Sequence, residues 1–168
     1  MKWLLKIIIK ILLSQLPIPY SSWKKIGLFK HGKMDSGDYA LKIFDLHYSK
    51  AYQEKIPENL TVLELGPGDS IASAIIGFSY GISKTFLIDI GEFATKDIKF
   101  YKELSMKLAS LGLNPPNLSE AKSIKEILVL SNAVYLSNGL NSLKSIKSKS
   151  IDFIWSHSVL EHIRKEQF

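Results

Sequence analysis

The stretch that most constrains the fold is "TVLELGPGDSIASAIIG", which covers residues 61–77. An apolar run that carries one acid, Glu64, leads into Gly66-Pro67-Gly68 and then into a helical pattern. This pattern predicts a buried strand over "TVLEL" and a helix over residues 69–80. A glycine turn between a buried strand and a helix is typical of α/β sheets, where it lets a ligand approach the backbone.

Predicted strands and helices continue to alternate along the rest of the chain. Helices are predicted over residues 38–54 and 93–111, in a short segment after Pro115-Pro116, and from Ser158 onward. The further strands are predicted at "TFLIDI" (85–90), "AVYLS" (133–137) and "IDFIW" (151–155). Buried strands joined by helical crossovers predict a Rossmann-like parallel α/β sheet. We expect this domain to cover residues 60–168, with an amphipathic helix and a helical cap over residues 1–59.

Composition excludes several classes of site. The 168 residues, 46% of them hydrophobic, suit a globular domain with a real core. The absence of cysteine excludes disulfides, thiolate metal sites and a cysteine nucleophile. The net charge of +6 comes from residues 1–50, and Arg164 is the sole arginine, so a nucleic-acid partner is not favoured. His157, Glu161 and His162 could imitate a metal cluster, but they lack a further partner and we expect no metal.

The N-terminal residues 1–16 are apolar but carry a lysine at every fourth position: Lys2, Lys6 and Lys10. The segment is shorter than the roughly 20 apolar residues that a spanning helix needs, and no small-residue cleavage site follows it. Two interpretations stay open. The helix covers the protein's own domain, which we favour, or it lies on an anionic membrane surface. His31 and His47 lie in the region that follows and are interpreted as surface or packing residues.

The sequence of the glycine turn limits the classes of ligand that it could bind. A dinucleotide turn requires G-x-G-x-x-G, but the third position here is Ile71, and Asp69 would repel a pyrophosphate. A nicotinamide-dependent oxidoreductase is therefore disfavoured. Glu64 suits a cationic group, so a ligand with ammonium and sulfonium centres fits. Asp89, at the end of the next predicted strand, can accept hydrogen bonds from both hydroxyls of a ribose.

The motifs "VLELGPGDS", "FLIDI", "YLSNGL" and "SIDFIWSHSVLEHI" resemble the cofactor motifs of class I S-adenosylmethionine-dependent methyltransferases. The resemblance covers about residues 60–165. "ELGPGDS", together with "LPIPYSSWKKIGLFKHGKMD", is most similar to methyltransferases encoded among bacterial surface-polysaccharide genes. The resemblance implies S-adenosyl-L-methionine as cofactor, O-methylation of a small-molecule or glycan acceptor in polysaccharide biosynthesis, and a cytoplasmic location. If residues 1–16 lie on an anionic membrane surface, the protein would be peripheral at the inner face of the membrane.

The resemblance also implies roles for single residues. Glu64, Gly66 and Gly68 would form the loop at the methionine end of the cofactor, and Asp89 would hold the ribose. Asn138 and Gly139 would lie near the adenine, where many members have an acid in place of the asparagine. After the fourth strand, His157 would be the general base or a supporting hydrogen-bond donor, Glu161 would cap the next helix or line the pocket, and His162 would be structural.

The family's sheet has seven strands, whereas this sequence ends after the fourth. We therefore expect a fragment or a truncated gene product that is poorly soluble and does not transfer methyl groups by itself. A noncatalytic, membrane-associated interaction protein built on part of a methyltransferase is the alternative from another functional class.

Overall fold

The computed structural model describes residues 33–52 and 57–160. The chain divides into two compact units, Met1–His31 and Gly32–Phe168, and the described residues all belong to the second unit. The predicted helix over residues 1–16, His31, and the predicted site residues Glu161 and His162 lie outside the described residues.

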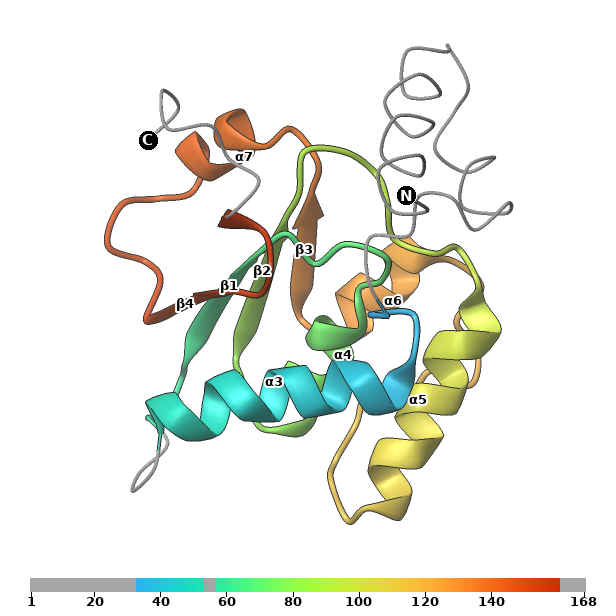
Figure 1. Cartoon of the computed structure of the whole chain (residues 1–168). Coiled ribbons are helices and arrows are strands. Elements are labelled where there is room, and N and C mark those ends of the chain that lie inside the picture. The colour runs from blue at the N-terminus through green and yellow to red at the C-terminus, as the bar shows by residue number, and fades with distance from the viewer. Residues whose placement is uncertain (1–32, 53–56, 161–168) are drawn as a thin grey trace, which may run out of the picture. The chain divides into compact units, whose positions relative to one another are not determined.

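Four parallel strands form the sheet, in the order β3-β2-β1-β4 (Figure 1). Their bounds are β1 Thr61–Leu65, β2 Lys84–Ile88, β3 Ala133–Leu136 and β4 Phe153–Ser156. All four strands were expected from their short apolar runs, within one or two residues at each end. The arrangement confirms an α/β fold with a parallel sheet, and it is compatible with a Rossmann-like architecture. Since the strands are parallel, their carboxyl ends meet at a single edge of the sheet.

Five described helices accompany the strands: α3 Gly37–Ala51, α4 Ala72–Ser79, α5 Ile98–Ser110, α6 Ile124–Leu130 and α7 Leu140–Lys144. The predicted helices over 69–80 and 93–111 were wrong at their start, because α4 begins at Ala72 and α5 at Ile98. Ser70 donates from its hydroxyl to the Met34 carbonyl at 2.5 Å, so the segment before α4 makes tertiary contacts instead of helical ones. The start of α5 is fixed by Asp97, whose side chain accepts a hydrogen bond from the Lys99 N–H.

One face of the sheet packs against α3, α4 and α5 (Figure 1). The register pairs Glu64 with Trp155, which places both side chains on this face. Trp155 meets Phe44 of α3 edge-on, with ring centroids 6.1 Å apart. Gly77 lets α4 approach β2, because a Cβ atom there would lie 3.1 Å from Thr85 Oγ1. Helix α3, expected as part of a cap, therefore shares its core with the sheet.

The opposite face of the sheet is less covered. Ile154 of β4 is 57% exposed, and Lys84 Nζ lies 4.9 Å from the centre of the half-buried Phe86 ring. Among the described residues, β4 pairs with β1 alone and forms one border of the sheet. No helix within residues 33–52 and 57–160 combines the length and the apolar character needed to cross a membrane.

Candidate functional site

The glycine loop after β1 lies at the carboxyl edge of the sheet and requires glycine for two reasons. Gly66 and Gly68 have φ angles of 73° and 66°, which side chains other than that of glycine rarely adopt. A Cβ atom on Gly66 would also lie 2.3 Å from Val159 Cγ2. The loop is anchored to β2, since the Gly66 N–H donates to the Ile88 carbonyl at 2.8 Å. The backbone is therefore held in one position, as binding a small ligand through backbone groups requires.

Asp89 directly follows β2 and joins the glycine loop to the next predicted site segment. Its Oδ2 accepts a hydrogen bond from the Gly68 N–H at 3.1 Å, and its Oδ1 accepts one from the Ile90 N–H at 2.7 Å. Its backbone carbonyl accepts from the Gly139 N–H at 2.8 Å. The structure thus brings together Gly68, Asp89 and Gly139, three residues selected from separate motifs of the sequence.

The segment after β3 contributes an apolar surface beside Asp89. Gly139 packs against Ile90, where an added Cβ atom would be 3.3 Å from Ile90 Cγ2. Ile90 is 82% exposed and Leu140 is 58% exposed, so both could lie against a flat apolar group. Asn138 donates from its backbone N–H to Ser142 Oγ at 2.9 Å. Ile90 was not predicted as a candidate site residue, although an aliphatic residue directly after a strand-end acid is a readable signal.

Glu64 is a buried acid at the end of β1. It is 2% exposed, and its Oε2 has no hydrogen-bond partner in the part of the chain that the structure describes. Burial raises the pKa of Glu64 to about 8; the Ser73 hydroxyl opposes the shift, and the charge of Asp89 adds to it. The carboxyl group is therefore largely protonated at neutral pH. A cationic group placed beside it would favour the ionised form.

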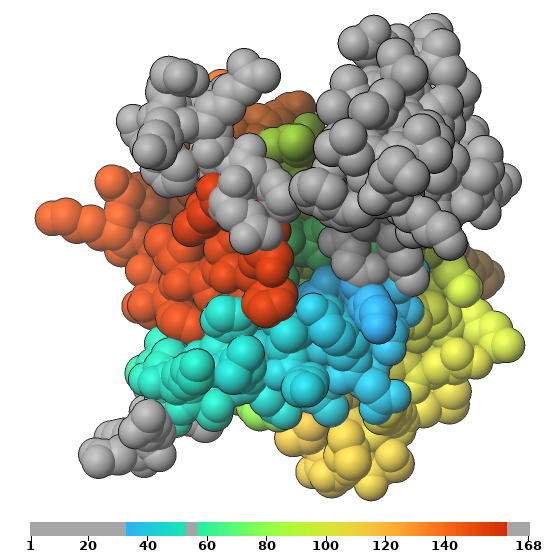
Figure 2. Space-filling model, in the orientation of Figure 1, coloured from blue at the N-terminus to red at the C-terminus, as the bar shows by residue number. Residues whose placement is uncertain are grey.

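His157 follows β4 and turns toward α3. His47 Nε2 lies 3.3 Å from His157 Nδ1, and the Tyr39 hydroxyl lies 3.5 Å from His157 Nε2. His47 also packs on Trp155, with ring centroids 4.8 Å apart. Burial lowers the pKa of His47, and the charges of His157 and Lys50 lower it further. Figure 2 shows α3 and the end of β4 side by side on one face of the molecule.

The sequence analysis took His47 for a surface or packing residue and did not select Tyr39. The available signal was their spacing, because residues eight positions apart on a helix are rotated by about 80° and so share one broad face. That spacing alone does not identify His157 as the partner.

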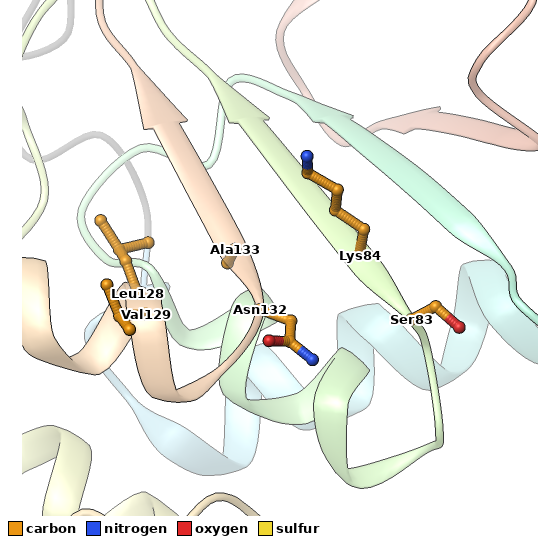
Figure 3. Close-up of a pocket in the computed structure, with 6 residues that line it drawn as sticks. All are labelled: Ser83, Lys84, Leu128, Val129, Asn132 and Ala133. Carbon is orange, nitrogen blue, oxygen red and sulfur yellow. The ribbon is translucent and has the colours of Figure 1, made fainter.

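A hollow of about 380 Å³ lies at the other edge of the sheet (Figure 3). Its lining comes from the amino ends of β2 and β3 and from α6: Ser83, Lys84, Leu128, Val129, Asn132 and Ala133. The glycine loop and Asp89 lie at the carboxyl ends of the strands, so this hollow is separate from the candidate site. Within the described ranges, 33–52 and 57–160, no cluster of three histidine or acidic residues is placed to hold a metal ion.

Comparison with known protein families gave no matching family model, and searches among curated proteins and solved structures gave no match either. The function of the protein is therefore inferred from its motifs and from the geometry of the carboxyl edge of the sheet.

Proposed function

We propose that this protein is an S-adenosylmethionine-dependent methyltransferase that acts on a hydroxyl of a sugar in a surface polysaccharide or its precursor. The main support for the proposal is the hydrogen bond that the Gly68 N–H donates to Asp89 Oδ2 at the carboxyl edge of the sheet. This contact places a loop suited to the methionine end beside a carboxylate suited to a ribose. The acceptor class comes from the resemblance of the motifs to methyltransferases of polysaccharide gene clusters.

The residues at this edge fit the parts of the cofactor. Gly66 and Gly68 allow close approach of the backbone to a carboxylate. The Oε2 atom of Glu64, which has no hydrogen-bond partner among the described residues, suits an ammonium group. Asp89 is oriented in advance by two backbone N–H groups, so little reordering is needed before it accepts from ribose hydroxyls. Ile90 would lie against the adenine ring, with Asn138 and Gly139 at its edge.

The cofactor supplies an electrophilic methyl group on a sulfonium centre. In the transfer that the bound cofactor would support, the acceptor oxygen would bond to the methyl carbon, the C–S electron pair would stay on sulfur, and the acceptor would lose its proton to a base. The protein contributes by aligning the two reactants and by keeping water from the reacting atoms. Its charged groups act before the transfer, in holding the cofactor.

Calorimetric titration of the 168-residue chain with S-adenosylhomocysteine and S-adenosylmethionine tests the proposal. Asp89→Asn should weaken binding of either ligand by about 2–4 kcal/mol, because hydrogen bonds to a charged acceptor become bonds to a neutral one. Asp97→Asn is the matched control, since Asp97 caps α5 away from the glycine loop and asparagine is also a good cap. Thermal melting of both variants verifies that they are folded.

Unchanged affinity in the Asp89 variant would refute the ribose assignment. Binding of a nicotinamide cofactor with none of the adenosyl ligands would favour an oxidoreductase instead. Failure to bind any adenosyl ligand, together with binding to acidic liposomes, would favour the noncatalytic membrane-associated protein.

A further inference from the structure

Three polar side chains link α3 to the end of β4 and have no part in cofactor binding as proposed above. They are Tyr39, His47 and His157, which we call the α3–β4 triad. Both ring nitrogens of His157 are engaged, Nδ1 with His47 at 3.3 Å and Nε2 with Tyr39 at 3.5 Å. His47 is held from a second side by its packing on Trp155. The central imidazole therefore has a defined orientation.

The triad stands directly beside the glycine loop. Strand β4 pairs with β1 so that Ser156 lies next to Leu65. His157 comes directly after Ser156, and Gly66 comes directly after Leu65, so the two residues follow paired positions. Two residues later, Val159 occupies the space that a side chain on Gly66 would need. Ser158 between them has a φ angle of 57°, a left-handed conformation that is unusual for serine. This backbone turn places His157 against α3 and Val159 against the loop.

The hydrogen bond between the two imidazoles has a consequence for proton transfer. A neutral imidazole carries one N–H, so only one of the two facing nitrogens donates. If His157 Nδ1–H donates to His47 Nε2, then His157 Nε2 carries a lone pair that faces the Tyr39 hydroxyl. In the opposite arrangement His157 Nε2 is protonated and is unable to accept a proton. The lowered pKa of His47 supports a neutral ring that is able to accept.

We propose that the α3–β4 triad is the acid–base relay for the methyl acceptor, an inference that rests on the proposed methyltransferase function. The Tyr39 hydroxyl takes the proton of the acceptor hydroxyl and gives its own proton to His157 Nε2. The acceptor oxygen, freed of its proton, bonds to the methyl carbon, and the C–S electron pair stays on sulfur. His47 is a positioning residue that holds His157 as the Nδ1–H tautomer. Tyr39 is thus the catalytic residue that meets the acceptor.

Nitrogen-15 NMR of the histidine rings in the 168-residue chain at neutral pH tests the relay without knowledge of the acceptor. The expected result is His157 as the neutral Nδ1–H tautomer. His47→Phe keeps an aromatic ring against Trp155 but removes the acceptor, so the major tautomer of His157 should change to Nε2–H. His47→Gln offers an amide oxygen as acceptor and should restore the Nδ1–H form. Tyr39→Phe should leave that tautomer in place.

Finding His157 in the wild-type chain as the Nε2–H tautomer, or as a cation, would overturn the relay. An unchanged tautomer in folded His47→Phe would overturn the role of His47. S-adenosylhomocysteine affinity, measured on the same samples, separates this inference from the proposed function. Loss of the relay with intact cofactor binding refutes only the inference, whereas absence of binding in the wild-type chain refutes the methyltransferase proposal.

Discussion

At the scale of single residues, the candidate site depends on a carboxyl group in a place where a charge is costly. Glu64 is buried at the end of β1, and no described residue satisfies its Oε2. Isolated buried carboxylates are unfavourable, so the group binds a proton instead. The ligand-free protein is therefore more stable when this proton is bound. This links the stability of the ligand-free protein to pH.

Glu64→Gln should flatten that pH dependence. The pKa of Glu64 is about 8 in the folded protein and ordinarily 4.5, so between these values the folded state binds more protons than the unfolded state. The free energy of unfolding therefore falls as pH rises through this window, by roughly 2–5 kcal/mol for a shift of this size. Urea unfolding of the ligand-free chain near both ends of the window measures the effect.

The matched control for that experiment is Glu103→Gln on the surface of α5, where the side chain is 58% exposed. This variant should keep the pH dependence of the wild-type chain. Equal slopes in wild type and Glu64→Gln would show that the buried carboxyl group is ionised throughout.

At the scale of elements, the glycine loop and the residues after β4 fit each other. Val159 fills the space above Gly66, and Ser158 takes a left-handed conformation to place it there. The contact joins two segments that are far apart in the sequence. A substitution in the glycine loop should therefore also affect the residues at the end of β4, beside the α3–β4 triad.

Gly66→Ala should destabilise the protein more than Gly81→Ala does. Both glycines have positive φ angles, 73° and 80°, so alanine costs about 1–2 kcal/mol at either position. Only Gly66 adds a collision with Val159, whereas an added Cβ on Gly81 meets nothing within 4 Å. Overpacking of this kind typically costs a further 1–3 kcal/mol, roughly. Denaturant unfolding of the two variants gives the difference.

A second substitution shows whether the collision is the cause. Val159→Ala in the Gly66→Ala background should recover most of the extra loss, because it removes the methyl groups that the new Cβ meets. If the double variant were as unstable as Gly66→Ala, the difference from Gly81→Ala would have another origin.

The strands, and the glycine turn and acid at their carboxyl ends, were predictable because they are local patterns. An apolar run predicts β1, and a strand-end acid identifies Asp89, without any knowledge of distant residues. The start of α4 was not predictable in this way, since the residues before it use their polar groups for tertiary contacts. The start of α5 does have a local signal, because Asp97 is an N-cap residue, but that signal was not used. The pairing of His47 with His157 spans 110 positions, and no local pattern carries that information.

At the scale of the whole molecule, the sheet has one well-covered face and one that is partly open. Helices α3, α4 and α5 cover the first, but on the other face Ile154 of β4 is 57% exposed. An exposed aliphatic residue on a strand that borders the sheet favours pairing between copies of a chain. Solubility should therefore depend on this strand.

Ile154→Thr should weaken self-association of the chain by about tenfold or more, because burial of one aliphatic side chain contributes about 1.5–3 kcal/mol and about 1.4 kcal/mol is a factor of ten. Threonine also favours strands, so β4 should be retained. Sedimentation at a series of concentrations measures the association. Val129→Thr is the control, since Val129 is 68% exposed but lies on α6. An equal effect of both changes would point to general hydrophobicity instead of the strand.

The position of β4 beside β1 also sets the order in which the sheet is completed during synthesis. Strand β1 pairs with β2 on one side soon after both are made, but its other side waits for β4, and the contact between Thr61 and Asp152 spans 91 positions. At ribosomal rates of about 5–20 residues per second, this edge stays open for roughly 5–20 s. For that interval the strand that carries Glu64 offers unpaired backbone groups to any partner, and a chaperone that shields extended segments would act there.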